Sequence, residues 1–277
     1  MAVKVVTDST SDIPVETARK HGVTVVPLTV HFGDQSFRDG VDIDSNTFFR
    51  KLTTSAALPH TAQPAPSAFL EVYQRLLAEG HHILSVHVSS KLSGTYNSAV
   101  LARADSGAPQ RITVIDSGWT SMCLGIPVLH AARAAQRGAS PAEVETELRD
   151  ALRRVDLLLF VDTLEYLQRG GRIGAARAFV GGLLSVKPLI TLRNGEVLPI
   201  GQVRQRAKAI ERVTQWFGEH PTVSEFSVLH AHSAPDAHRL LQQLRGRFPL
   251  AEAHITEVGP VVATHVGPGA IGVALLT

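Results

Sequence analysis

Ser89-Ser90-Lys91-Leu92-Ser93-Gly94-Thr95-Tyr96-Asn97-Ser98-Ala99 is the stretch from which the fold of this chain can be worked out. Residues 83–88 before it form an apolar run of strand length, and residues 99–104 after it can continue as a helix. The stretch is therefore a strand-to-helix turn, in which the first N–H groups of the helix are unpaired at the positive end of its dipole. Such a turn suits a carboxylate or a phosphate, although Ser and Thr are also favoured there simply as helix caps.

Composition describes an ordinary globular protein of one large domain or two modest ones. The 277 residues are 44% hydrophobic and 19% charged, and the net charge of +2 is not concentrated in any run of Lys or Arg, which argues against a nucleic-acid partner. The single cysteine, Cys123, excludes an internal disulfide and fits a reducing compartment. We find no signal-peptide pattern and no apolar run approaching the ~18 residues that span a bilayer. We expect a soluble cytoplasmic protein without stable membrane insertion.

The first half of the chain alternates between apolar strands and amphipathic helices. Strands are expected at residues 3–6, 23–30, 83–88 and 112–115. Helices are expected after Pro14, between Pro64 and Gly80, and from the capping box Ser140–Glu143. A second hydroxyl-rich junction, residues 7–12, follows the first strand. This alternation predicts a parallel sheet covered by helices on both faces. Ligands bind such sheets beyond the carboxyl ends of the strands, where the two junctions would gather.

The second half changes character. Asn194-Gly195 separates two apolar runs and is the strongest short signal for a β-hairpin. Further strands are expected at residues 157–161, 226–232, 254–258, 261–265 and 272–276, and helices at 207–217 and 235–248. The fold class is therefore α/β, with an N-terminal, mostly parallel α/β/α domain over residues 1–155. A C-terminal α+β domain over residues 156–277, with a largely antiparallel sheet, is expected to close over the ligand.

One apparent nucleotide-binding motif lacks the sequence context that its mechanism requires. Residues 267–272, Gly-Pro-Gly-Ala-Ile-Gly, match the letters of a dinucleotide-binding loop. That mechanism needs a helix after the turn and an acidic residue roughly 20 positions later, but only five residues follow the motif. We therefore interpret the match as accidental.

Two side-chain groups could support catalysis. Asp8 ends the first strand, where a nucleophilic carboxylate could sit, but an N-cap or loop-bracing role is the more common one there. His230 and His232 fall on one face of an expected strand near Asp236 and His238, which is compatible with a metal site. A chain with 13 histidines produces such coincidences easily, so a metal site is the less favoured interpretation.

Short segments spread over the whole chain resemble the DegV family. They are TDSTSDIP (7–14), VVPLTV (25–30), FRDGVDI (37–43), TAQP (61–64), SSKLSGTYNSA (89–99), LEYLQRGGRI (164–173), LLSVKPLI (183–190), KAIERV (208–213) and THVGPGAIG (264–272). Each segment is modest alone, but their joint order and spacing are highly specific.

The resemblance implies a two-domain protein that buries a long-chain fatty acid, with the carboxylate between the domains. It implies head-group binding by the hydroxyls of Thr61 and Ser93, by His265 from the second domain, and by Arg169 as a basic residue beside the site. Gly94 and Thr95 belong to the same turn as Ser93 and complete the expected ligand-binding set. One departure is Ala62, where the family usually has Ser, which removes a possible secondary hydrogen bond.

Some members of this family are the fatty-acid-binding subunit of a bacterial fatty acid kinase. The resemblance therefore implies a non-catalytic subunit that presents the acid to an ATP-dependent kinase partner, with no metal and no cofactor besides the bound acid. Two alternatives stay open. One is a phosphohydrolase or phosphotransferase that uses Asp8 or a metal, and the other is a lipid-binding regulator without a kinase partner.

Overall fold

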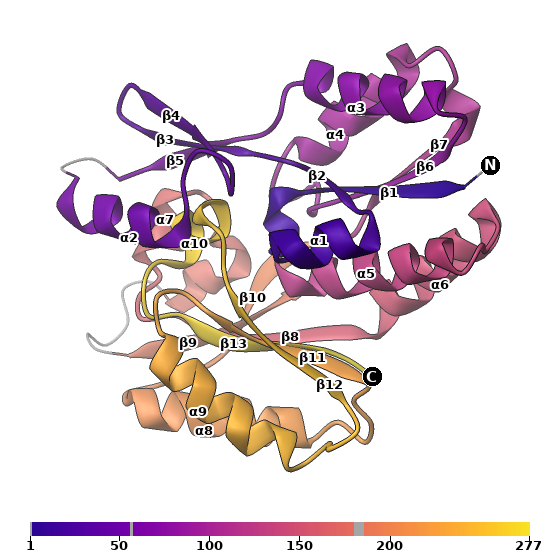
Figure 1. Cartoon of the computed structure of the whole chain (residues 1–277). Helices are drawn as coiled ribbons and strands as arrows, with labels where there is room; N and C mark the ends of the chain where they lie inside the picture. Colours follow the sequence, from indigo (N-terminus) through magenta and orange to yellow (C-terminus); the bar gives the residue numbers. More distant parts are fainter. Residues whose placement is uncertain (1, 56–57, 180–185) are drawn as a thin grey trace.

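The computed structural model describes residues 2–55, 58–179 and 186–277 (Figure 1). Its first sheet has the order β2-β1-β6-β7, and every neighbouring pair is parallel. The strands are β1 (Val3–Asp8), β2 (Thr24–Val26), β6 (His82–His87) and β7 (Ile112–Asp116). The prediction of a parallel N-terminal sheet is confirmed.

Helices cover both faces of this sheet, as Figure 1 shows. One face carries α3 (Pro66–Ala78) and α4 (Thr95–Asp105), which bury Phe69 and Tyr73 in a compact apolar cluster. The helices of the other face are α1 (Val15–His21), α5 (Met122–Gln136) and α6 (Pro141–Arg154). The predicted capping box at Ser140 and Glu143 is present at the start of α6. The long buried helix α5 was not predicted, because its apolar residues lie all round and give no amphipathic stripe.

The strand expected over residues 23–30 is wrong in one respect, because two strands of different sheets share it. β2 ends at Val26, and the chain then passes through Pro27, which has no N–H for a sheet ladder. β3 (Thr29–Phe32) instead pairs antiparallel with β4 (Gln35–Arg38) and β5 (His60–Ala62). Helix α2 (Ser45–Thr54) lies between β4 and β5 in the chain. This small sheet places Thr61, in β5, next to the second half of the molecule.

The second sheet has six strands in the order β10-β9-β8-β13-β11-β12, and only the pair β11 and β12 is parallel. The strands are β8 (Val155–Phe160), β9 (Lys187–Arg193), β10 (Glu196–Val203), β11 (Glu225–His230), β12 (Glu252–Glu257) and β13 (Ile271–Leu276). Asn194 and Gly195 turn the β9–β10 hairpin with φ of 51° and 82°, as a type I′ turn requires. The largely antiparallel second sheet is confirmed, and its first strand begins at Val155.

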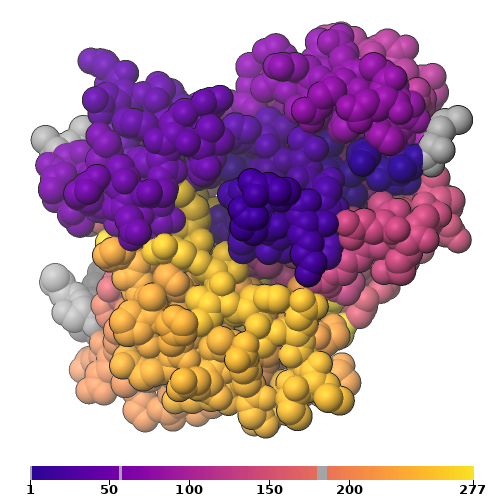
Figure 2. Space-filling model, in the orientation of Figure 1, coloured from indigo at the N-terminus to yellow at the C-terminus, as the bar shows by residue number. Residues whose placement is uncertain are grey.

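Two helices cover the outer face of the second sheet, and its inner face meets the first half of the molecule. The outer helices are α8 (Arg206–Gly218) and α9 (Ala234–Arg245), and their apolar sides share a core with Phe160 and Phe226. On the inner side, α5 touches β8, β11 and β13. In the space-filling view, N-terminal and C-terminal residues meet along a line across the face of the molecule (Figure 2).

The expected strand at residues 261–265 is wrong: this segment is the helix α10 (Pro260–Val266). Val261 and Val262 favour a strand by local propensity. Gly259 and Pro260 instead form a helix start, with Pro in the first turn, and packing then buries Pro260 to Thr264. The difference matters because α10 carries His265 toward the first half of the molecule.

The remaining elements are short. They are the 3-10 turns Ser9–Ser11, Pro109–Arg111 and Gly174–Phe179 and the helix α7 (Glu165–Arg169). The first three residues of the segment LLSVKPLI lie outside the described residues. In the described part of the chain, no helix combines the length and the apolar character needed to cross a bilayer.

Candidate functional site

A deep pocket lies between the second sheet and the carboxyl ends of the first sheet's strands. It contains about 900 Å³ free of protein atoms, counting its open mouth. The first half of the chain lines it with Thr61 of β5 and with residues that follow β1, β2, β6 and β7, among them Thr10, Val88 and Thr120. The pocket therefore sits where ligands bind parallel sheets, and the second sheet closes it.

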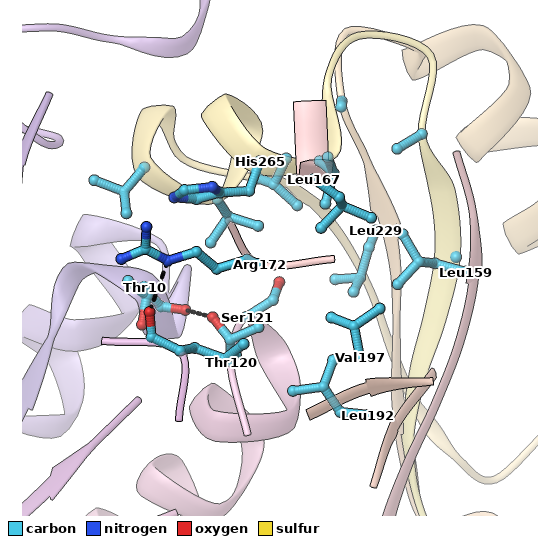
Figure 3. Close-up of a pocket in the computed structure, with 18 of the residues that line it drawn as sticks. Thr10, Thr120, Ser121, Leu159, Leu167, Arg172, Leu192, Val197, Leu229 and His265 are labelled. Atoms are coloured by element: carbon cyan, nitrogen blue, oxygen red, sulfur yellow. Dashed lines mark hydrogen bonds between the residues drawn. The ribbon is translucent and has the colours of Figure 1, made fainter. Parts of the chain in front are cut away.

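One side of the pocket is almost entirely apolar. The second sheet points alternate side chains of several strands into it, and Figure 3 shows Leu159, Leu192, Val197 and Leu229 gathered there. Further apolar lining comes from Leu157, Leu167, Ile190, Val258, Val261, Val262, Val266 and Ile271. This wall suits a hydrocarbon chain, because its apolar side chains have no hydrogen-bonding groups that such a ligand would leave unpaired.

The polar side of the pocket brings together Thr61, Ser93, His265 and Arg172. The Thr61 hydroxyl lies 3.1 Å from Nε2 of His265, although 204 residues separate the two in the chain. Nδ1 of His265 is buried, and none of the residues that the structure describes offers it a hydrogen bond. Figure 3 places the His265 ring and the Arg172 side chain on the same side of the pocket. The cluster can therefore offer one cationic group and several hydroxyl or ring donors to an anion.

Backbone carbonyls hold the Arg172 guanidinium in place. Its Nε donates to the carbonyl of Leu92 at 2.9 Å and its Nη1 to the carbonyl of Gly170 at 2.6 Å. No carboxylate among the described residues pairs with it, so within this part of the chain the positive charge remains available to an anionic ligand. The pKa of His265 is lowered to about 4, first by burial and then by the charge of Arg172, so the ring is neutral at pH 7 and has one proton to donate.

Ser93, Gly94 and Thr95 have different positions in the turn before α4. Ser93 lines the pocket, and its hydroxyl lies 2.9 Å from that of Thr95. Thr95 is fully buried. It contacts the polar cluster through the hydroxyl of Ser93 and does not itself line the pocket. Gly94 lies against the side chain of Gln63, which a Cβ at this position would overlap. The turn after β6 is thereby packed against the segment that carries Thr61.

The structure does not bring Arg169 to the pocket. Its side chain is 61% exposed and pairs with Glu165 at 2.7 Å. Arg169 borders a neighbouring depression that it shares with Thr61, Arg172 and His265, so it lies beside the polar cluster and not in the deep pocket. The sequence carries both arginines in LQRGGRI, and nothing in that pattern says which of them turns inward.

A second polar group on the pocket wall was not predicted as part of the site. Thr10, from the first hydroxyl-rich junction, accepts a hydrogen bond through its carbonyl from the N–H of Ser121 at 2.6 Å. Ser121 has a φ of 53° and bonds to Asp12 through its hydroxyl at 2.6 Å. The junction at residues 7–12 was expected to reach the site, but the sequence gives no signal for Thr120 and Ser121.

Two buried aspartates hold the start of α10. Asp12 accepts a hydrogen bond from the N–H of Gly259 at 2.9 Å, and Asp39 lies beside the same glycine. Burial raises the pKa of Asp39 to about 7, although hydrogen bonds from Ser9 and from the backbone of Val261 oppose the shift. Since α10 carries His265, both carboxyl groups lie at the start of the helix that positions the polar cluster.

We expect the stability of the protein to fall as the pH rises from about 4 to 7. Asp39 has a folded-state pKa of about 7 against an ordinary pKa of 3.8, so the folded state binds the proton more tightly and loses this advantage as the pH passes through 7. Asp39→Asn should reduce this slope, as measured by urea unfolding at a series of pH values. A variant that keeps the wild-type slope would show that Asp39 is not the titrating group.

We expect Gly170→Ala to displace His265. A Cβ at residue 170 would overlap Nδ1 of that ring, and the ring has little room to yield because it is buried and bonded to Thr61. The φ of Gly170 is −72°, so the backbone itself tolerates alanine. Affinity for an anionic ligand of the pocket should fall about tenfold, the loss of about one hydrogen bond. The control is Gly246→Ala, where the nearest atom lies 3.9 Å from the added Cβ, and full affinity in Gly170→Ala would contradict the role of His265.

The groups considered for catalysis are differently placed. Asp8 is fully buried and accepts hydrogen bonds from the backbone and hydroxyl of Thr10 and from the backbone of Val88, so it braces the loop as favoured from the sequence. His230 lines the pocket, whereas His232 is exposed with a φ of 53° and stacks near Phe49. The residues 267–272 lead into β13 rather than into a helix, and Gly267 packs against the Tyr166 ring.

Comparison with known proteins agrees with this architecture. The sequence profile of a family described as "Uncharacterised protein, DegV family" matches residues 2–277. A DegV domain-containing protein of Streptomyces coelicolor is 39% identical over 277 residues, covering 99% of this chain and 98% of that protein.

Solved structures of DegV proteins are similar over the full chain. A DegV family protein from Thermus thermophilus, whose structure concerns fatty acid binding, superposes with a TM-score of 0.93 at 38% identity and 100% coverage of both chains. DegV of Bacillus subtilis, described as a fatty acid binding protein, gives a TM-score of 0.90 at 31% identity, again with 100% coverage of both chains.

Proposed function

The chain belongs to the DegV family, and from that premise we propose that it binds one long-chain fatty acid in the deep pocket. The tail would lie along the apolar wall of the second sheet, and the carboxylate would lie at the polar cluster. The observation that carries the proposal is that one pocket joins a long apolar side to a polar end with an arginine. The related Thermus and Bacillus proteins, described as fatty acid binding, support it.

The tail would supply most of the affinity. Burying each methylene group contributes about 0.8 kcal/mol, so a chain of about fifteen methylenes gains on the order of 10 kcal/mol of transfer free energy. Part of this gain is lost in ordering the chain and in restricting its motion. The polar cluster would offset the desolvation of the carboxylate and fix the direction of the acid.

Each polar side chain has a distinct part in holding the carboxylate. The neutral His265 ring can donate its Nε2 proton to Thr61, which leaves the Thr61 hydroxyl free to donate to the carboxylate. The Ser93 hydroxyl supplies a second donor, and Arg172 supplies the charge. Gly94 and Thr95 position Ser93, and Arg169, paired with Glu165, lies beside the cluster in the neighbouring depression.

We expect the double variant Thr61→Val, Ser93→Ala to bind fatty acid about 10- to 100-fold more weakly, because two hydroxyl donors to a charged group are lost. Valine preserves the shape of Thr61, so the fold should be unchanged. Titration of the delipidated protein with palmitate measures the effect, with Thr146→Val on α6 as the matched control. Undiminished affinity in the double variant would count against these head-group residues.

The bound carboxylate would serve an ATP-dependent kinase partner in the cytoplasm. In that reaction a carboxylate oxygen attacks the γ-phosphorus of ATP, which breaks the bond to the β–γ bridging oxygen and yields an acyl phosphate and ADP. The depression shared by Thr61, Arg169, Arg172 and His265 supports this, because the polar end of the pocket borders it and a partner could reach the carboxylate there.

The test has two arms. Denaturing the purified protein should release a long-chain fatty acid, which mass spectrometry then identifies. With a fatty acid kinase and ATP, the loaded protein should yield acyl phosphate, and without the kinase it should yield none. Release of acid without kinase-dependent turnover would favour a lipid-binding regulator, and turnover of a phosphate ester by the protein alone would favour the phosphohydrolase.

A further inference from the structure

A second cluster of chemically active side chains lies at the edge of the second sheet. The parallel strands β11 and β12 place Glu225 beside Glu252 and Ser227 beside His254. Because side chains alternate along a strand, Glu225, Glu252 and His254 project from the same face. Helix α5 packs on this face and brings His130 and Arg133 to it.

Glu225 is the buried centre of this cluster. The residue is 2% exposed, and its Oε2 accepts hydrogen bonds from Nε2 of His130 and Nη1 of Arg133, both at 3.0 Å. Its Oε1 is equally buried but has no hydrogen-bond partner among the described residues. A buried carboxylate oxygen without a partner is costly, so this atom needs an explanation.

A second unpartnered atom points to the same place. Nε2 of His254 is buried, and no hydrogen bond to it is found in the described part of the chain. It lies 3.7 Å from Oε1 of Glu225 and 3.3 Å from Oε1 of Glu252. Two orphaned buried atoms and a second carboxylate therefore converge on one point between the strands.

The charge of the cluster favours a cation there. Among the described residues, these two carboxylates have one arginine partner, Arg133, which bonds the far oxygen of Glu225 and reaches Glu252 at 3.4 Å. The hydrogen bonds of His130 and Arg133 to Oε2 hold the Glu225 carboxyl group with Oε1 directed at the gap.

We propose that Glu225, Glu252 and His254 bind a divalent transition metal ion of the zinc class. Their ligand atoms all lie within 4.8 Å of one another. Zinc bound tetrahedrally at about 2.0–2.1 Å separates its ligand atoms by roughly 3.3 Å, so the observed 3.3 and 3.7 Å need only small adjustments. Water takes the fourth position, since Glu252 and His254 are partly exposed.

His130 and Arg133 act as the outer shell of this site. By bonding Oε2 of Glu225 they fix the orientation in which Oε1 faces the metal. The ion ties the edge strand β12 to β11, and through Glu225 to α5, which belongs to the first half of the molecule. None of the three ligands lines the deep pocket, so the metal site is independent of the fatty acid proposal.

Zinc titration of the chelator-treated full chain tests the site. Isothermal calorimetry should give one saturable site, and Co²⁺ in place of Zn²⁺ should give the visible absorption of a tetrahedral complex. Zinc at a hundredfold excess over its dissociation constant should raise the thermal midpoint by about 5 °C. Glu252→Gln and His254→Ala are partly exposed positions that should fold normally and weaken binding at least tenfold.

His238→Ala, an exposed histidine of α9 outside the cluster, is the control and should bind zinc as the wild type does. Absence of saturable binding would overturn the proposal. So would binding that survives both Glu252→Gln and His254→Ala, because the ion would then be held by other histidines of the 13 in the chain. A pH-dependent gain in stability without zinc binding would show that a proton on His254 fills the gap, which also overturns it.

Discussion

Shortening the ligand from palmitate to octanoate should weaken binding by about four orders of magnitude. The two acids share the carboxylate and differ by eight methylene groups, each worth about 0.8 kcal/mol when it is buried. The sum of about 6 kcal/mol corresponds to a factor somewhat above 10⁴ in the dissociation constant. The apolar wall of the pocket is the only part of the site that this change affects.

Calorimetric titration of the delipidated protein with acids of graded length measures this dependence. Each two-carbon step should change affinity by a similar factor until the pocket is filled. For comparison, removing the Thr61 and Ser93 hydroxyls should lower the affinity for the fatty acid by at most about 100-fold. A series in which palmitate and octanoate bind within tenfold of one another would show that the tail does not lie in the apolar pocket.

Asp8→Ala should destabilise the protein by about 4 kcal/mol, without touching the ligand directly. Asp8 accepts four buried hydrogen bonds, from Thr10 twice, from the N–H of Val88 at 3.0 Å, and from Nδ1 of His87 at 3.1 Å. Removing the carboxylate leaves these groups unpaired in the interior, which is among the most costly of single changes. The thermal midpoint should fall by about 10 °C.

Asp8 belongs to a buried hydrogen-bond network, so we expect this loss of stability at Asp8 and not at an aspartate on the surface. His87 continues to the hydroxyl of Ser85 at 2.7 Å, which in turn accepts from Tyr73 at 2.7 Å, so one buried chain of bonds crosses the first sheet. Asp150→Ala on the surface of α6 is the control and should cost less than 1 kcal/mol. A stable Asp8→Ala protein that loses turnover of a phosphate ester would instead make Asp8 a nucleophile.

Local patterns in the sequence predicted most of the architecture. The alternation of strands and helices in the first half and the Asn194-Gly195 hairpin both correspond to elements of the structure, because turn chemistry and strand-to-helix junctions are local properties. Helix α10 was mistaken for a strand because two adjacent valines have high strand propensity, whereas tertiary burial and the Gly259-Pro260 start decide its conformation. Pro27 similarly divides one apolar run between two sheets.

Parts of the site could not be predicted from local sequence patterns, because they depend on contacts between distant segments; Thr61 and His265 were named only through the family resemblance. Thr61 and His265 are 204 positions apart and meet only through the packing of α10. The choice between Arg169 and Arg172 depends on the direction in which the chain leaves α7. The wall residues of the pocket resemble ordinary core residues in the sequence, since both are buried aliphatic side chains.

A crystal structure of the protein with palmitate tests the central claim most directly. We expect the carboxylate within hydrogen-bond distance of Thr61 and Ser93 and near Arg172, with the alkyl chain against Leu159, Leu192 and Leu229. An acid bound with its carboxylate at the apolar wall, or bound on the surface with the deep pocket unfilled, would contradict the account.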